Sequence, residues 1–242
     1  NNSLISGELE VMGSVSADDD LASSALSYRL VGEALPGTLV FQTALPVVSQ
    51  RLTVLDTSIL SEGQDYIIRL QAEDLTGNSS FVEHVFTVDN LTPNAPLDLY
   101  NEGVIFDSVE LSWTPSSESD LAAYVVFRNG SIISGGQSIS SGLISTPDYL
   151  DEGVPDGVHQ YHVVAVDQAG NVSLPSNVVE VDINRRAPDA WFTSPATDHE
   201  FEFPVLLQAT SDDSDIATMF FEYTTDGSTW QPLSTDSEAP FD

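Results

Sequence analysis

The chain contains no cysteine and no lysine. Without cysteine it can form no disulfide, no thiolate metal site and no cysteine nucleophile. Its six basic residues are all arginines and face 38 acidic residues, which gives a formal net charge of −32 at pH 7. Proteins bind nucleic acids and anionic membranes by neutralising phosphates with basic side chains. The composition therefore excludes nucleic acid as a partner, whereas the same negative field attracts divalent cations.

Long apolar runs are also missing. No stretch approaches the roughly 20 apolar residues that a membrane-spanning helix requires, and the first residues lack the charged start and apolar core of a signal peptide. We expect no direct membrane insertion, and we interpret the sequence as an internal or processed piece of a longer chain. The absence of disulfides favours a bacterial or archaeal source, and of these we expect a bacterial protein. An acidic surface suited to salty water favours a location outside the cell or at its surface.

Helical periodicity is absent as well, and the pattern that remains is that of β-strands. Leu9, Val11 and Val15 alternate with polar neighbours, as do Tyr66 and Ile68, which is the period of half-buried strands. Turn-forming residues interrupt the chain every eight to twelve residues or so, the spacing found in β-sandwiches. With 242 residues and 41% hydrophobic content, the chain is predicted to be all-β, with enough apolar residues to form several cores.

Two short phrases recur at nearly constant spacing. Asp20-Leu21-Ala22 returns as Asp120-Leu121-Ala122 and as Asp215-Ile216-Ala217, with starts 100 and 95 residues apart. The pattern Asp-x-x-Gly-Asn occurs at 74–78 and again at 167–171. This spacing is the length of one small β-sandwich, so the chain is predicted to be a tandem array of similar modules.

Proline-bearing linkers set the expected module boundaries. The segment from Asn90 to Pro96 contains two prolines that fix φ and stiffen the connection, and a second linker ends at Pro188. We predict an immunoglobulin-like sandwich over 1–92, a fibronectin type III sandwich over 93–183, and an incomplete immunoglobulin-like sandwich over 184–242.

The second module resembles a fibronectin type III domain in three motifs. Val109-Glu110-Leu111-Ser112-Trp113 is similar to strand B with its buried tryptophan, Asp120 to Arg128 is similar to strand C, and Tyr161 to Ser173 is similar to strand F turning into strand G. The family's corner tyrosine would stand eight residues before the turn aspartate. The first module has Tyr66 at that place, whereas the second has His159.

The first and third modules resemble bacterial immunoglobulin-like repeats. The resemblance of the first lies in Gly63-x-x-Tyr66-x-x-Arg69-Leu70 and Val88-Asp89-Asn90, and that of the third in the run from Phe220 to Trp230. Within that run, Asp226-Gly227 predicts a two-residue hairpin turn, because glycine tolerates positive φ. Such modules occur in adhesins, in secreted hydrolases as spacers and in large repeat-containing toxins, so the resemblance implies a large secreted or cell-surface protein.

Clustered acidic residues are the candidate metal site, and calcium is the candidate cofactor. Calcium prefers six to eight oxygen ligands, which aspartates and backbone carbonyls at loops or domain junctions supply. The candidate ligands are Asp18, Asp19, Asp20, Asp89, Asn90, Asp212, Asp213 and Asp215. A further acidic loop, 118–120, occurs in the second module. The alternative is that these loops are simply solvated, with aspartates capping their own turns.

Other motifs have structural explanations that compete with functional ones. The Asp-x-x-Gly-Asn motifs are typical of tight turns, and ligand loops are the alternative. Trp191-Phe192 and Trp230 suit core or interface packing, and a sugar-stacking platform is the alternative. No catalytic residue is assigned, because 38 acidic residues offer many carboxylate pairs and no local signature selects one.

These observations lead to one leading hypothesis and several alternatives. The leading hypothesis is a non-catalytic spacer segment of a large bacterial surface or secreted protein, a semi-rigid rod that presents another domain in an adhesion-type role. Its partners would be other domains of the same polypeptide, and a cell-surface protein or polysaccharide. The alternatives are a carbohydrate- or protein-binding module of a secreted hydrolase or large toxin, and a subunit of a filament or shell.

Overall fold

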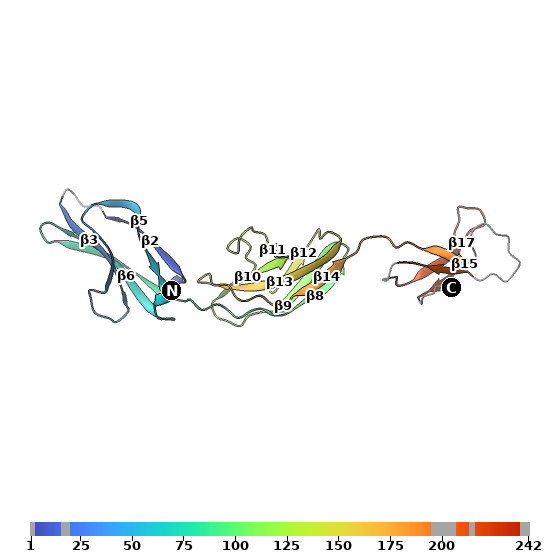
Figure 1. Ribbon diagram of the computed structural model, residues 1–242, viewed down its shortest axis with the longest axis horizontal. Helices are drawn as coiled ribbons and strands as arrows, with labels where there is room; N and C mark the ends of the chain where they lie inside the picture. The colour runs from blue at the N-terminus through green and yellow to red at the C-terminus, as the bar shows by residue number, and fades with distance from the viewer. Residues whose placement is uncertain (1–2, 16–19, 195–206, 213–215, 238–242) are drawn as a thin grey trace. The chain divides into compact units, whose positions relative to one another are not determined.

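A computed structural model describes residues 3–15, 20–194, 207–212 and 216–237 of the chain (Figure 1). Strands dominate these residues, and their only helical element is the 3-10 turn η1 (Thr57–Ile59). The all-β prediction is therefore confirmed. Within this part of the chain no helix is long and apolar enough to cross a membrane. The chain divides into two compact units, residues 1–183 and residues 184–242.

The first unit begins with a sandwich of a five-stranded and a two-stranded sheet. The larger sheet has the order β1 (Ser3–Ile5), β7 (Ser79–Val88), β6 (Asp65–Asp74), β3 (Leu21–Leu30), β4 (Thr38–Thr43). The smaller pairs β2 (Glu8–Val15) with β5 (Val47–Asp56). The core between them contains Leu26, Phe86 and Val88 from one sheet and Leu52 and Leu55 from the other. The alternation seen in the sequence thus directs one face of each strand inward.

The same unit contains a second sandwich with its own core. Its four-stranded sheet has the order β11 (Ser131–Ile132), β10 (Leu121–Arg128), β13 (Gly157–Asp167), β14 (Val179–Ile183). Its three-stranded sheet has the order β12 (Asp148–Asp151), β9 (Ser108–Thr114), β8 (Leu97–Ile105). Trp113 is buried, as the resemblance of its segment to strand B implied, and it packs against Tyr124 with ring centroids 5.3 Å apart. The division into modules at residue 92 remains a prediction.

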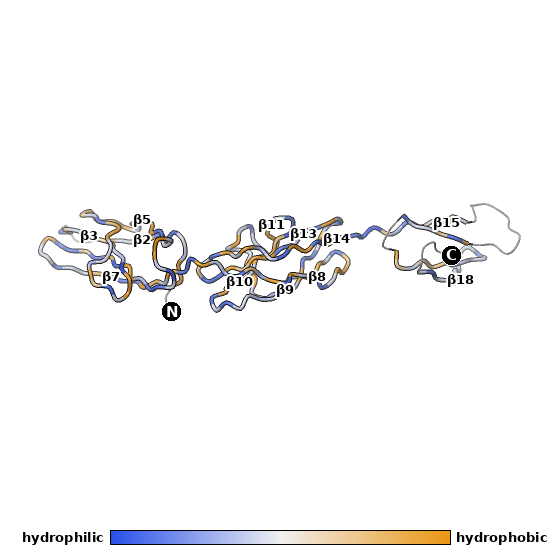
Figure 2. Tube along the Cα trace, turned by 60° about the horizontal axis from the view of Figure 1, so that its bottom comes forward, coloured by the Kyte–Doolittle hydropathy of each residue, from blue (hydrophilic) through white to orange (hydrophobic). Residues whose placement is uncertain are grey.

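The two central strands of the second sandwich are buried on both faces. Tyr124 and Val126 face the main core, whereas Val125 lies in a smaller cluster with Val164 and Val166 on the other side. A strand covered on both sides reads as a continuous apolar run rather than an alternation, and Figure 2 shows hydrophobic stretches along these strands.

In each sandwich, the side chain eight residues before the turn aspartate forms a hydrogen bond with the backbone a few residues upstream. In the first sandwich the Tyr66 hydroxyl accepts a hydrogen bond from the Ser61 amide at 3.0 Å. In the second, His159 Nε2 lies 2.8 Å from the carbonyl oxygen of Pro155. The histidine therefore makes a bond back to the upstream backbone, in the place where the fibronectin type III pattern has tyrosine.

The second unit contains two strand pairs, β15 (Trp191–Ser194) with β16 (Gln208–Thr210) and β17 (Met219–Tyr223) with β18 (Gln231–Asp236). The prediction of a two-residue turn at Asp226-Gly227 is wrong, because Tyr223 pairs with Gln231 and the loop spans residues 224–230. Asp226 closes this longer loop by accepting hydrogen bonds from the amides of Ser228 and Thr229 at 2.9 and 2.7 Å.

Candidate functional site

Three aspartates that lie far apart in the sequence meet where the two sandwiches of the first unit join. Asp89 directly follows β7, Asp120 directly precedes β10, and Asp167 ends β13. One candidate ligand oxygen from each carboxylate lies within 4.8 Å of the others. The group consists of one residue from the first sandwich and two from the second, and we refer to it as the junction cluster.

Pairing between β10 and β13 places two members of the cluster side by side. Leu121 is opposite Asp167 in the ladder, and the Gln168 amide donates a hydrogen bond to the Asp120 carbonyl at 2.9 Å. The first sandwich repeats this arrangement, since Leu21 pairs with Asp74 and the Leu75 amide donates to the Asp20 carbonyl at 2.8 Å. In each sandwich, the two repeated phrases therefore lie next to each other on paired strands.

The Asp-x-x-Gly-Asn motifs form the tight turns that were predicted. Asp167 accepts hydrogen bonds from the Asn171 amide at 2.8 Å and from Asn171 Nδ2 at 2.9 Å. Gly170 has φ +92°, a conformation that favours glycine. Asp74 and Asn78 make the same pair of bonds at 2.9 and 2.8 Å. The motif thus fixes its aspartate rigidly at the end of the strand.

The Asp-x-x-Gly-Asn turn of the second sandwich also contacts the first sandwich. Asn171 Nδ2 donates to the backbone carbonyl of Asp89 at 2.8 Å, and the Ser6 hydroxyl donates to Asn171 Oδ1. The Asp89 amide in turn donates to the Ile5 carbonyl at 3.0 Å. One asparagine side chain therefore links the last strand of the first sandwich to the turn that holds Asp167.

The junction cluster is strongly negative, and two of its three carboxylates are buried. Asp89 is 7% exposed and Asp167 is 4% exposed, whereas Asp120 is half-buried. Asp89 Oδ2 is inaccessible and has no hydrogen-bond partner among the described residues. Burial raises the pKa of Asp89, and the nearby charges of Asp167, Asp120 and Glu62 raise it further. Its carboxylate is thus ionised only at a cost, unless a positive charge offsets the repulsion.

No basic side chain supplies that charge in the described part of the junction. The residues that line the hollow around the cluster include Glu62 and Glu118 but neither arginine nor histidine. Both glutamates are used in backbone contacts: Glu62 accepts a hydrogen bond from the Asn90 amide at 2.8 Å, and Glu118 accepts one from the Asn94 amide at 2.9 Å. The donor set is therefore oxygen only, which suits hard cations such as calcium or magnesium.

The structure places the other predicted metal ligands in different surroundings. Asn90 Oδ1 accepts hydrogen bonds from the Gly7 amide at 3.1 Å and from the Thr57 hydroxyl at 3.0 Å, so this side chain ties the linker to the first sandwich. Asp20 lies beside Asp74, and Asp212 is exposed. The remaining candidates, Asp18, Asp19, Asp213 and Asp215, lie outside the described residues. Metal binding by these residues remains a prediction.

Two members of the junction cluster were not among the residues selected from the sequence. Asp120 lies in an acidic loop that the sequence pointed to, whereas Asp167 was interpreted only as a turn residue. The available signal was the repetition itself. In both sandwiches an aspartate precedes the strand that starts with Leu-Ala, and another aspartate ends the strand that leads into the Asp-x-x-Gly-Asn turn. Antiparallel pairing of those two strands brings the two aspartates together.

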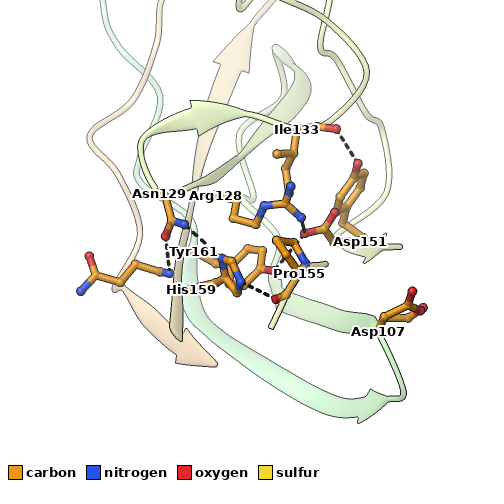
Figure 3. A network of polar contacts seen from close by, with 11 residues as sticks. Asp107, Arg128, Asn129, Ile133, Asp151, Pro155, His159 and Tyr161 are labelled. Carbon is orange, nitrogen blue, oxygen red and sulfur yellow. Dashed lines mark hydrogen bonds and ion pairs between the residues drawn. The ribbon is translucent and has the colours of Figure 1, made fainter. Parts of the chain in front are cut away.

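A second polar network lies inside the second sandwich, at its other end. Arg128 Nη1 lies 2.7 Å from Asp151 Oδ2, and the Tyr161 hydroxyl donates to the same oxygen at 2.9 Å (Figure 3). Asp151 is 6% exposed, and Tyr161 is completely buried. His159 contacts the turn after β10, where its Nδ1 lies 3.0 Å from Asn129 Nδ2. Every buried charge in this network has a partner, so its geometry suits a structural role.

The aromatic residues of the second unit are more exposed than core residues. Trp191 is 43% exposed and Trp230 is 60% exposed. Phe192 lies 6.3 Å from Phe221, between ring centroids, and both line a hollow with Met219. Among the described residues of this unit, neither tryptophan is buried in a core.

Comparison with known proteins gives two relatives in sequence. Chitinase A1 of Niallia circulans is 29% identical over 154 residues, which are 60% of this chain and 21% of the chitinase. Exoglucanase B of Cellulomonas fimi is 31% identical over 172 residues, which are 65% of this chain and 15% of the exoglucanase. No family model matches the chain.

Partial similarity to solved structures includes two sets of fibronectin type III modules. The fibronectin(III)-like modules of Clostridium thermocellum CbhA give a TM-score of 0.49 at 13% identity, covering 75% of this chain and 88% of that one. The FN1–FN3 domains of chicken CNTN1 give 0.48 at 14% identity, covering 76% and 68%.

The chain resembles tandem modules of the fibronectin type III and immunoglobulin-like kind, as its motifs predicted. It spans only about a fifth of the chitinase and less of the exoglucanase, so the similarity concerns one part of each larger polypeptide. The comparisons support a non-catalytic module of a secreted protein. They also support other domains of the same polypeptide as its partners.

Proposed function

We propose that this chain is a spacer segment of a large secreted bacterial protein, and that it holds another domain at a defined distance and orientation. The observation that supports this most strongly is the hydrogen-bonded junction between the two sandwiches of the first unit. Two sandwiches that served only as independent binding modules would not need their connection to be fixed.

The linker between the sandwiches is anchored on both sides. Asn90 is bound to Thr57 and Gly7 of the first sandwich, and Asn94 is bound to Glu118 of the second through its amide at 2.9 Å and its side chain at 2.5 Å. The three residues between these anchors include Pro93, which is buried and has a fixed φ. Few backbone torsions are left to bend the connection, which suits a stiff spacer.

The relatives suggest what the spacer would present. Both are named for the hydrolysis of polysaccharides, chitin and glucan, and a polysaccharide-degrading domain is therefore the first candidate for the presented domain. An adhesive domain at the cell surface is the other candidate, and the stiff junction would serve either one equally well.

Labelling across the junction tests the spacer function. The chain has no cysteine, so cysteines introduced at the exposed positions Gln50 and Glu110 would be the only labelling sites. We expect spin labels at these positions to give one narrow distance distribution by double electron–electron resonance. A broad distribution, as a flexible coil would give, would contradict a stiff spacer. Each label paired with a second label within its own sandwich provides the control for label mobility.

The exposed tryptophans favour a second candidate, a carbohydrate-binding module in the second unit. Aromatic faces stack on sugar rings, and exposed tryptophans are suited to this role. The whole chain should be incubated with insoluble chitin and with cellulose and then centrifuged. A spacer stays in the supernatant. Binding that is lost when Trp191 and Trp230 are replaced by alanine would establish the binding module instead.

A further inference from the structure

We propose that the junction cluster of Asp89, Asp120 and Asp167 binds one calcium ion, which fastens the two sandwiches of the first unit to each other. Three carboxylates whose oxygens lie within 4.8 Å of one another are not by themselves a site, because acidic residues are frequent in this chain. The inference depends on how these particular carboxylates are buried and partnered.

The decisive group is the side chain of Asp89. It is 7% exposed, and its Oδ2 atom is inaccessible to solvent and has no hydrogen-bond partner in the described part of the chain. A buried carboxylate oxygen normally finds a donor, and leaving it without one is costly. This oxygen belongs to the carboxylate that lies within 4.8 Å of the ligand oxygens of Asp120 and Asp167. A cation shared by the three carboxylates supplies the missing partner and cancels the repulsion between them.

The chemistry of the surroundings selects a hard divalent ion. The lining residues offer carboxylate, carbonyl and hydroxyl oxygens and contain no histidine, and the chain has no cysteine, so zinc lacks its preferred ligands. Calcium accepts an irregular set of oxygens with water completing the shell, whereas magnesium demands near-octahedral geometry. Ligands drawn from three separate segments therefore fit calcium better. Calcium sites of extracellular modules typically have dissociation constants of about 10⁻⁴ to 10⁻³ M.

The position of the cluster gives the ion a mechanical effect. Asp89 belongs to the end of the first sandwich, whereas Asp120 and Asp167 belong to adjacent strands of the second. All three can contact one ion only while the sandwiches keep their relative orientation, so binding and fixing of the junction are linked. The stiffening role rests on the spacer function proposed above, whereas the binding of calcium does not.

Isothermal titration of the whole chain with calcium chloride, after treatment with a chelator, tests the binding. We expect one site of the affinity given above, weakened at least about tenfold by Asp89→Asn, because a neutral amide replaces one of three charged ligands. Asp148→Asn is the matched control, since this exposed strand residue undergoes the same chemical change in the second sandwich. Equal binding by Asp89→Asn and the unmodified chain would overturn the proposal.

Asp20→Asn separates the junction from the equivalent position in the first sandwich. Asp20 and Asp74 repeat the arrangement of Asp120 and Asp167 without a linker aspartate among the described residues. We expect Asp20→Asn to leave the tightest calcium site unchanged. Loss of that site in Asp20→Asn, with Asp89→Asn unaffected, would place the calcium in the first acidic loop and refute the junction site.

Thermal unfolding supplies a readout that a purely structural aspartate would not give. In chelator, Asp89→Asn removes repulsion and should unfold at the same temperature as the unmodified chain or a higher one. With calcium in excess the order should reverse, because only the unmodified chain gains from binding. If calcium changes the unfolding temperature of neither protein, the proposal is refuted.

The labelled pair at positions 50 and 110 links the ion to the junction. We expect the distance distribution to broaden in chelator and to narrow again on adding calcium. Binding that leaves this distribution narrow under both conditions would refute the fastening role while leaving the spacer function intact. A distribution that is broad with and without calcium would refute the spacer function itself, so the two failures are distinguishable.

Discussion

Replacing Arg128 by methionine tests whether the charge network of the second sandwich stabilises the fold. Methionine keeps much of the arginine's apolar stem but leaves the Asp151 carboxylate, 6% exposed, with only the Tyr161 hydroxyl as a side-chain donor. Breaking a buried ion pair costs about 3–5 kcal/mol. Because the Arg128 side chain is 25% exposed and water screens part of the interaction, we expect a loss of about 2–3 kcal/mol.

Two further variants separate the charge from the hydrogen bond. Tyr161→Phe removes one hydrogen bond to a charged acceptor but leaves the ion pair, and should cost about 1.5 kcal/mol. Adding Asp151→Asn to Arg128→Met should restore about 1 kcal/mol or more, since the double variant contains no unpaired buried charge. Recovery on adding a second substitution is the signature of an unpaired carboxylate, because independent losses would add.

Tryptophan fluorescence reports this sandwich selectively after two changes elsewhere. Trp113 lies in its core, and the only other tryptophans, Trp191 and Trp230, lie in the second unit. In a background with both replaced by phenylalanine, urea unfolding followed at Trp113 gives the free energy of unfolding of the second sandwich. A loss below about 0.5 kcal/mol for Arg128→Met, as for exposed pairs, would refute the reasoning, and so would a double variant less stable than Arg128→Met.

Three further outcomes are expected. His159→Ala should destabilise the second sandwich by about 1–2 kcal/mol in urea unfolding, because it removes the hydrogen bond to the Pro155 carbonyl. His159→Tyr should cost less, and equal losses for the two variants would contradict a role of this side chain in the corner. Burial lowers the pKa of His162, so the folded state disfavours the charged ring, and the free energy of unfolding should fall as pH drops below about 6.5, the usual histidine value. His162→Phe keeps a ring stacked on Phe127 and should remove this pH dependence. A pH profile unchanged by the substitution would refute the assignment to His162. Hydrogen bonds from Asn78 and Thr76 lower the pKa of Asp74 to about 2, so the stabilisation from this turn should persist at pH 5 and disappear between about pH 4 and 2; acid unfolding followed by the side-chain signals of the turn in NMR spectra checks this, and loss already at pH 5 would contradict it.

The sequence by itself determined the fold class and the local structure of the repeats. Period-two patterning predicts strands because alternate side chains of a strand face opposite sides, and β2 and β6 follow it. The Asp-x-x-Gly-Asn motif predicts its own turn, since the aspartate, the glycine and the asparagine interact within five residues. The corner residue Tyr66 followed from the resemblance to the fibronectin type III pattern.

Local reasoning was wrong where a competing contact lay a few residues further on. Asp226-Gly227 carries the composition of a two-residue turn, yet Asp226 accepts bonds from Ser228 and Thr229 and so stabilises a wider loop. The pairing of Tyr223 with Gln231 depends on how the two strands pack, which a dipeptide does not encode. The loop length was therefore decided by the strands on either side.

Only the tertiary structure decided which acidic residues meet. Clusters of acidic residues in the sequence pointed to aspartates that are neighbours along the chain. The side chains of such neighbours often point in different directions. Asp89, Asp120 and Asp167 come from three segments and converge because β10 pairs with β13 and because Asn171 holds the end of β7 against that pair. A long-range strand register and one hydrogen bond across two sandwiches create the junction cluster. The repeated phrases indicate the pairing of Asp120 with Asp167, whereas the hydrogen bond that brings Asp89 to them leaves no signal in the sequence.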